Sequence, residues 1–332
     1  MNKTTKIILW IVLLAILAFF PKIAGVYYTN VFVGFAIFAI FAVAVNMLLG
    51  YTGLLSFGHA MFFGFGGYGT ALALVHIEGI SLFGAIGIGF LSALVLSLVL
   101  CPLVVRVSGT AFAMLHLAFG ELFCVLALKM RNITRGEDGL GNFPIPPINI
   151  PGFDPIPIKA APDNFYYLAM MIIGLMLWLM WFFTKTPFGQ VQVAIRDNAK
   201  RVDYLGYKVP QSKAVIYVLS AIFSGLAGSL YALFHNLVSV DGSLGVRISF
   251  TPITAAMIGG MGSFFGPIWG TAFVQIIEEI ALRITDHVEL VNGIIIILVI
   301  MFAPTGLYGF FVKFKQRWQK PTTGGAEMEK TS

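Results

Sequence analysis

The sequence predicts an all-α membrane protein, a polytopic helical bundle of about ten transmembrane helices in a single domain covering 1–332. Three properties support this prediction: 58% of the 332 residues are hydrophobic, 11% are charged, and the mean hydropathy is +0.89. Soluble domains have about 45–50% apolar and about 25% charged residues. Since one span uses about 20 apolar residues, the chain has room for roughly eight to ten spans and for no substantial soluble domain.

Apolar runs give the expected spans in order along the chain. They lie at 6–21, 30–49, 54–76, 81–105, 109–130, 164–184, 211–236, 245–260, 264–284 and 290–309. The first run has the charged start of a signal peptide, but no small-residue cleavage site follows, so we expect it to be retained as a span. Cys101 and Cys124 lie in apolar runs and are too few for a disulfide framework or a metal site.

Charge predicts the orientation. With the amino terminus in the cytoplasm, residues 185–212 and the tail 311–332 lie inside, and the loop 131–163 lies outside. About two thirds of the 21 lysine and arginine residues then face the cytoplasm, and more than half of the 15 acidic residues, Asp241 among them, fall in outer loops. This agrees with the positive-inside tendency, so the net charge of +6 indicates membrane orientation and not nucleic-acid binding.

The outer loop 131–163 holds nearly half of the 15 prolines in the chain. Proline favours extended geometry and excludes a helix over most of this length. We expect a stiff cap or a docking surface on the extracytoplasmic side.

The cytoplasmic segment 185–212 is the longest charged segment between spans. From Val191 to Leu205, apolar residues recur at helical spacing with charged residues between them, which predicts a short amphipathic helix against the membrane. Gly206 is expected to end it as a C-cap. Such a helix is either a connector that orients the chain or a docking helix for a cytoplasmic partner.

Sequence motifs of enzymes give no support for catalysis. "GFGGYG" at 64–69 matches G-x-G-x-x-G, but that pattern indicates a dinucleotide site only between a strand and a helix, and its flanks here are apolar. No phosphate-binding G-x-x-x-x-G-K-[ST], H-E-x-x-H or G-x-S-x-G occurs. We therefore expect no catalytic, cofactor or metal residues in this chain.

Polar residues inside the expected spans are candidates for a translocation path. Glu121 lies near the middle of 109–130, where a carboxylate needs a partner, a proton or water. It either borders the path or is hydrogen-bonded between helices, and we favour the second reading. Asn46, Ser56 and His59 are its candidate partners or line the path. Glu278, Glu279 and Arg283 lie toward the outer end of 264–284.

Glycine is abundant in "GYTGLLSFGHAMFFGFGGYG", residues 50–69. Glycine inside a helix costs about 1 kcal/mol relative to alanine, but in a bilayer small residues stabilise bundles by letting backbones approach closely. We therefore expect Gly64, Gly66, Gly67 and Gly69 to pack against a neighbouring helix at a tight, broken start of the third span. Gly262, Gly266 and Gly270 form two overlapping G-x-x-x-G steps with the same expected role.

The cytoplasmic segment also carries a family resemblance. "FGQVQVAIRDNAKRVDYLGYKV", followed by "KAVIYVLSAIFSGLAGSLYA", resembles the signature of permeases of the branched-chain amino acid ABC importer family, M-type subunit. The matching signature residues are Gly189, Ala194, Ile195, Arg196, Asp197, Asn198, Leu205 and Gly206, with Lys213 and the "GLAG" of residues 225–228 after them. Further segments, among them "RVSGTAFAMLHLAFGEL", "TRGEDGLGNFP" and "FAPTGLYGFF", extend the resemblance in order over nearly the whole chain.

The resemblance implies a vitamin B12-importer-like permease, that is, a type II ABC importer, in the cell inner (plasma) membrane. Its implied partners are a second homologous permease, two cytoplasmic ATPase subunits that hold ATP and Mg, an extracytoplasmic substrate-binding protein and membrane lipid. The helix at 191–205 would be the coupling helix, with Arg196 and Asp197 in polar contacts and Ile195 as its anchor in an ATPase cleft.

The implied substrates are leucine, isoleucine and valine. Relatives that move urea, short amides or other amino acids leave the substrate open. A secondary transporter or a channel-like facilitator is the alternative of a different class, which the scarcity of acids at membrane depth disfavours.

Overall fold

The computed structural model describes residues 3–148, 155–158 and 162–283, with isolated positions between 290 and 306, and the side chains from residue 16 onward. The described helices are α1 (Lys3–Thr52), α2 (Ala60–His76), α3 (Leu82–Val104), α4 (Thr110–Lys129), α5 (Arg131–Thr134), α6 (Pro162–Lys185), α7 (Pro187–Tyr204), α8 (Val209–His235), α9 (Val240–Ser243), α10 (Val246–Gly259) and α11 (Gly266–Leu282). The strands are β1 (Leu140–Gly141) and β2 (Leu237–Val238).

Five of the described helices are long and apolar enough to cross a membrane. They are Ile16–Thr52, Leu82–Val104, Thr110–Lys129, Asp163–Lys185 and Val209–His235, and the apolar α2 is shorter. The expectation of an all-α membrane protein is therefore confirmed. Expected spans 245–260 and 264–284 correspond to α10 and α11, while most of 290–309 and the tail 311–332 lie outside the described residues.

Two expected spans, 6–21 and 30–49, belong to one helix with a break. Inside α1, Gly25 has φ 76° and ψ 169°, a conformation that side-chain-bearing residues rarely adopt, and Pro21 precedes it by one turn. The hydroxyls of Tyr166 and Tyr167 in α6 donate to the carbonyls of Leu17 and Ala18, each at 2.8 Å. These bonds join α6 to the helix just before its break.

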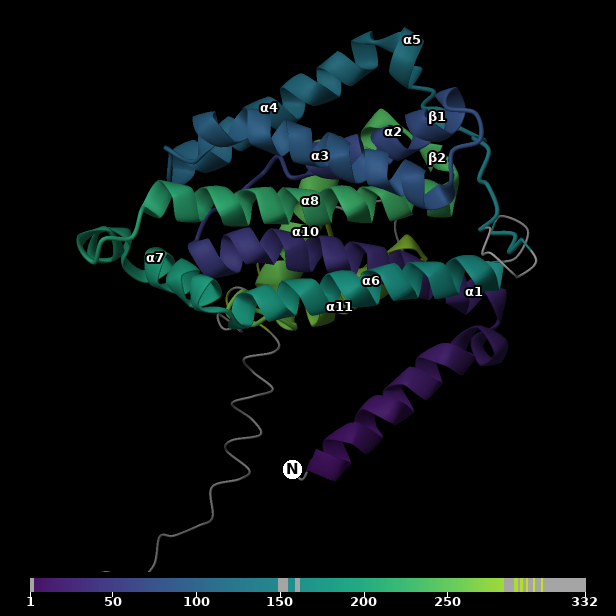
Figure 1. Ribbon diagram of the computed structural model, residues 1–332, viewed down its shortest axis with the longest axis horizontal. Helices are drawn as coiled ribbons and strands as arrows, with labels where there is room; N and C mark the ends of the chain where they lie inside the picture. The colour runs from purple at the N-terminus through teal and green to yellow at the C-terminus, as the bar shows by residue number, and fades with distance from the viewer. Residues whose placement is uncertain are drawn as a thin grey trace, which may run out of the picture.

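The helices α3, α6 and α8 run along the long axis of the molecule, with α7 at one end and the β1–β2 pair at the other (Figure 1). β1 and β2 are antiparallel, with Leu140 opposite Val238 and Gly141 opposite Leu237. The pair ties the proline-rich loop, of which α5 and β1 are described parts, to the turn after α8. We refer below to the α7 end and the sheet end of the bundle.

The glycines of α2 allow close contact with three different elements. A side chain at Gly66 would overlap the backbone of Gly225 in α8, and one at Gly67 would lie 3.2 Å from the Gly228 carbonyl. Gly69 faces α3, where an added Cβ would lie 2.6 Å from Ser92 Oγ, and Gly64 faces Leu244, just after α9. The chain at 53–59 is not helical, so the third span begins at Ala60 and not at residue 54.

Of the three glycines expected to pack closely near the carboxyl end, Gly262, Gly266 and Gly270, two do so. Side chains at Gly266 and Gly270 would overlap the backbones of Gly260 and Ala255, so α11 lies directly against α10. Gly262, by contrast, lies in the connection between the two helices with open space around its Cα. The expected packing role of Gly262 is therefore wrong, because the helix begins only at Gly266.

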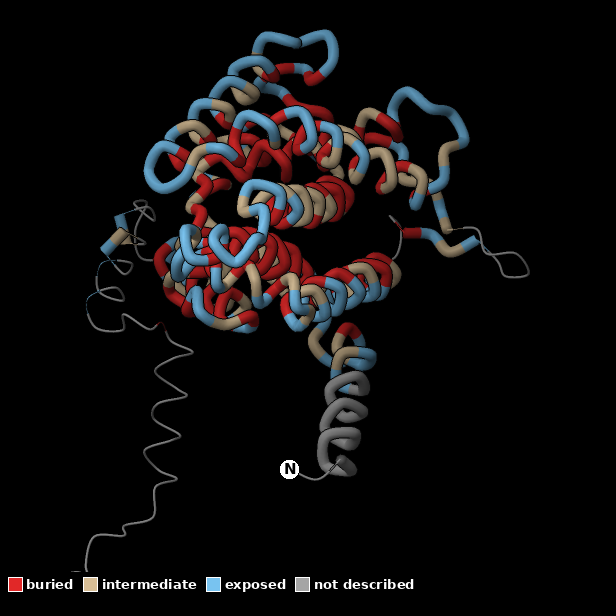
Figure 2. The backbone as a smooth tube through the Cα atoms, turned by 60° about the vertical axis from the view of Figure 1, so that its left-hand side comes forward, coloured by how far each residue is buried: buried red, intermediate tan, exposed pale blue. Residues whose placement is uncertain are grey.

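Burial is uneven across the bundle. Buried residues concentrate in the second half of α1, in α2 and in α8, whereas α4, at the top of Figure 1 and Figure 2, is exposed along its outer side. Only Phe112, Ala113, His116, Gly120 and Ala127 of α4 are buried. One face of α4 is thus open in this chain.

Candidate functional site

The amphipathic helix α7 begins earlier than its apolar pattern predicts. Thr186 is its N-cap, whose Oγ1 accepts from the Gly189 backbone N–H at 3.4 Å, and Pro187 takes the first helical position. The helix is broken at Asn198 (φ −159°, ψ 92°), where Asn198 Oδ1 accepts from the Arg201 N–H at 3.0 Å. This bond restarts the helix for one further turn.

Gly206 ends α7 with a left-handed backbone, φ 89°. The Gly206 N–H donates to the Asp203 carbonyl at 2.9 Å, and the Tyr207 N–H donates to the Val202 carbonyl at 3.3 Å. These two bonds form a Schellman motif, in which glycine is favoured because it has no Cβ. The helix therefore stops before α8 and turns back toward the bundle.

The two faces of α7 have different surroundings. Ile195 (3% exposed) and Val202 (4%) are buried against the rest of the chain, whereas Tyr204 (87%), Leu205 (71%) and Tyr207 (51%) protrude at its carboxyl end. The expected role of Ile195 as an anchor in a partner protein is therefore corrected: Ile195 holds α7 to its own bundle. The outward apolar group is the one at 204–207.

Arg196 links α7 to α1. Its Nη1 donates to the Gly50 carbonyl at 2.6 Å, and its Nε lies 3.2 Å from Asp197 Oδ1. Gly50 belongs to the last turn of α1, whose carbonyls lack helical partners and attract cations. Of the signature residues, Arg196 thus connects the α7 end of the bundle to a membrane-spanning helix.

His59 is at the centre of a buried hydrogen-bond network. Its Nδ1 lies 2.8 Å from Ser56 Oγ and its Nε2 lies 2.8 Å from Ser220 Oγ. Ser220 Oγ in turn donates to the Ala44 carbonyl at 2.6 Å. The imidazole is fully buried, so it joins α1, the start of α2 and α8 and does not line an open path in this chain.

The other candidate path residues lie apart from this network. Asn46 Nδ2 donates to the Ser263 carbonyl at 3.1 Å, which fastens α1 to the α10–α11 connection. Glu121 is exposed on the outer side of α4 and has no hydrogen bond or ion pair within the part of the chain that the structure describes. The expected pairing of Glu121 with Asn46, Ser56 or His59 is therefore wrong.

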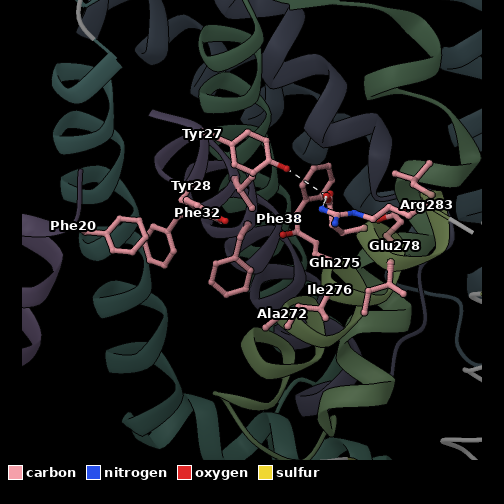
Figure 3. A pocket seen from close by; sticks show the side chains of 16 residues that line it. Phe20, Tyr27, Tyr28, Phe32, Phe38, Ala272, Gln275, Ile276, Glu278 and Arg283 are labelled. Atoms are coloured by element: carbon pink, nitrogen blue, oxygen red, sulfur yellow. Dashed lines mark hydrogen bonds and ion pairs between the residues drawn. The ribbon is translucent and has the colours of Figure 1, made fainter. Parts of the chain in front are cut away.

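A pocket of about 770 Å³ opens between α1 and α11 (Figure 3). Aromatic side chains, among them Phe32 and Phe38, line it. Its rim carries charges that pair with each other: Arg283 Nη2 lies 2.9 Å from Glu279 Oε1, and Arg247 Nη2 lies 3.3 Å from Glu278 Oε1. The charges at the carboxyl end of α11 thus form the polar edge of a mainly apolar side pocket.

The structure places Asp241, expected in an outer loop, in the short helix α9. Asp241 reads as an outer-loop residue, but α9 contacts α4 and packs beside α2, where a Cβ on Gly64 would lie 3.2 Å from the Ser243 carbonyl. The chain therefore turns back along the bundle after α8. No sequence signal shows this, because "LVSVDGSLG" has the composition of a surface turn.

These features define a polytopic α-helical membrane permease with one amphipathic helix outside the spans. The family model described as branched-chain amino acid transport system / permease component matches residues 27–304, and the chain belongs to this family.

Several curated relatives are similar over most of the chain. The high-affinity branched-chain amino acid transport system permease protein LivM of Escherichia coli K12 is 26% identical, over 82% of this chain and 67% of the relative. The corresponding LivH of Salmonella typhimurium is 21% identical, over 82% and 91%. The probable branched-chain amino acid transport permease protein LivM of Methanocaldococcus jannaschii is 22% identical, over 82% and 90%. No solved structure matches the chain.

Proposed function

We propose that the chain is a permease subunit of an ATP-driven ABC importer that moves leucine, isoleucine and valine into the cell. It pairs with a second homologous permease, receives substrate from an extracytoplasmic binding protein, and is driven by two ATPase subunits that hold ATP and Mg. Membership of the permease family and similarity to both LivM and LivH support this assembly.

The observation that carries the proposal is the outward end of α7. Tyr204, Leu205 and Tyr207 are exposed beside Lys200 and Arg201, which are exposed too. Large apolar side chains on a charged surface mark protein contact sites. We assign this end of α7 as the coupling element that an ATPase subunit holds.

The Arg196–Gly50 hydrogen bond gives the coupling element a mechanical role. An ATPase that moves α7 pulls on the end of α1 through this bond and on α6 and α8 through the chain itself. Rigid-body rocking of membrane helices about such an element is one of the known kinds of switching transition. Ile195 and Val202 support it by keeping α7 seated on the bundle.

The finer architecture belongs to the same proposal. We assign about ten spans with vitamin B12-importer-like, type II topology in the inner membrane, with both termini and α7 in the cytoplasm and the sheet end outside. The excess of basic residues on the α7 side and the break of α1 at Gly25, which divides it into two spans, support this topology.

Reconstitution tests the proposal. The chain, its companion permease, ATPases and binding protein are placed in liposomes, and uptake of leucine and of urea is measured with and without internal ATP. We expect ATP-dependent leucine uptake. ATP-dependent uptake of urea alone assigns the chain to the urea and amide relatives, and uptake indifferent to ATP assigns it to secondary transporters or facilitators.

The docking role of α7 has its own test. Leu205→Asp places a charge in the proposed contact, and we expect it to abolish co-purification of the ATPase and leucine uptake while the permease still inserts. Ile77→Asp is the matched control, because Ile77 is 46% exposed in the connection between α2 and α3. Normal ATPase binding by Leu205→Asp would refute the assignment.

A further inference from the structure

Two exposed acidic side chains belong to helices that contact each other. Glu121 is exposed on α4, Asp241 is exposed on α9, and the two helices are in contact. Both carboxylates interact electrostatically with the thiol of Cys124, one turn along α4 from Glu121. Neither belongs to the pocket of Figure 3, which residues of α1 and α11 line.

Glu121 lies at membrane depth, and Asp241 packs beside the apolar helix α2. Glu121 is near the middle of the span Thr110–Lys129. Asp241 lies beside the first half of α2, since the neighbouring Ser243 and Leu244 face Gly64. Glu121 is thus far from both ends of α4, whereas Asp241 lies near the first turns of α2.

The hydroxyl of Tyr68 is a third polar group beside Asp241, and its lack of a partner within the described part of the chain suggests that a ligand binds there. Tyr68 is one turn beyond Gly64 on α2 and therefore on the same face of that helix. Its side chain is 6% exposed, and its hydroxyl is buried without a hydrogen-bond partner among the described residues. The hydroxyl interacts electrostatically with Asp241 and Cys124, so it lies on the side of α2 that faces α9 and α4. An unpartnered buried hydroxyl is unfavourable unless something accepts or donates there.

Contact with lipid would be unfavourable for the face that carries Glu121 and Asp241. Carboxylates at membrane depth are unfavourable toward hydrocarbon and normally face water, a partner or a pathway. Within the residues described, no lysine or arginine forms an ion pair with either acid. A cationic group from outside this chain is the missing complement.

We propose that Glu121 and Asp241, with the Tyr68 hydroxyl, bind the ammonium group of the transported amino acid on a water-lined face that the second permease subunit closes. The inference rests on the proposed importer function and sharpens its substrate class. Two negative charges favour an ammonium-bearing amino acid and give no advantage to urea or a short amide, which are neutral.

The native Cys124 serves as a probe of this site. The assembled importer in liposomes is treated with water-soluble methanethiosulfonate reagents of positive or negative charge, and modification of the Cys124 peptide is followed by mass spectrometry. A site lined by one sign of charge raises the local concentration of counter-ions about tenfold or more. We expect the cationic reagent to react at least about tenfold faster, and this ratio to fall as salt screens the acids.

The variants Glu121→Gln and Asp241→Asn should each reduce the ratio, and the double variant should bring it near one. Glu78→Gln and Asp163→Asn are matched controls, because both acids are exposed at the ends of helices, outside this site. Equal rates for the two reagents in the wild-type complex, or no reaction with either, overturn the proposal.

Transport separates substrate binding from a structural role. With saturating binding protein, the double variant should take up leucine about tenfold more slowly than wild type, while its ATP hydrolysis stays within about twofold of wild type. The conservative variant Glu121→Asp keeps the charge and should take up leucine faster than Glu121→Gln. Unchanged uptake, or an equal fall in uptake and ATP hydrolysis, contradicts ammonium binding. If the wild-type importer does not move leucine at all, the proposed function fails, whereas the Cys124 ratio still decides whether the acidic site exists.

Discussion

Replacing Gly66 with alanine tests whether glycine holds the bundle together by close backbone approach. An added Cβ would overlap the carbonyl oxygen and carbon of Gly225 and lie 2.6 Å from its Cα. All three are backbone atoms, so no side chain can rotate away, and α2 and α8 must separate. Overpacking of this kind costs about 1–3 kcal/mol, offset by at most about 1 kcal/mol from the better helix propensity of alanine.

Thermal unfolding in detergent, followed by intrinsic fluorescence, measures the effect. A loss of about 1–2 kcal/mol lowers the unfolding midpoint of a protein of this size by several degrees, at about 2–4 °C per kcal/mol or somewhat less. Gly174→Ala in α6 is the control, because no heavy atom lies within 4 Å of its added Cβ, and its midpoint should stay or rise. Equal midpoints for the two variants would refute the close-approach argument.

Three further variants test the hydrogen bonds and the backbone near α7 and α2. Arg196→Gln removes the charged bond to the Gly50 carbonyl, worth about 1 kcal/mol at a partly exposed site, and should slow uptake while ATP hydrolysis continues. The control Lys129→Gln, at the exposed carboxyl end of α4, should change neither rate. His59→Ala removes hydrogen bonds from two buried serine hydroxyls, of which Ser220 keeps its bond to the Ala44 carbonyl, and should cost about 1–3 kcal/mol, measured as a lower unfolding midpoint; His59→Gln should cost less. Gly206→Ala forces a side chain into φ 89° and should cost about 1–2 kcal/mol, seen as faster amide hydrogen exchange confined to the end of α7, with Gly206→Asn less affected.

The five long apolar helices were predictable because hydropathy depends on composition, but the continuity of α1 across 22–29 was not. The sequence near 22–29 contains charge and aromatic residues and reads as a loop between two helices. In the structure, α1 covers this stretch and is broken at Gly25, where the backbone is not helical. Whether a glycine ends a helix or merely bends it depends on the neighbours that pack on each half, and here α6 packs on the first half near Leu17.

For α7, periodicity predicted the element and its C-cap but not which side meets a partner. Ile195 lies among the family-like signature residues and was therefore expected to face outward, yet it is buried. An apolar stripe on an amphipathic helix is satisfied first by its own bundle. The exposed apolar residues Tyr204, Leu205 and Tyr207 lie at the end of α7 and in the turn after it. Helical periodicity does not extend into a turn, so it could not predict which way these side chains point.

The acidic face illustrates a different limit of sequence reasoning. Glu121 was identifiable from its charge in an apolar run, but its candidate partners by sequence, Asn46, Ser56 and His59, form their hydrogen bonds with other groups. Asp241, whose helix α9 contacts α4, is 120 positions away and is brought there by the turn after α8. Two neighbouring carboxylates repel each other unless water or a cation compensates their charge, and the proposed ammonium site would supply that cation.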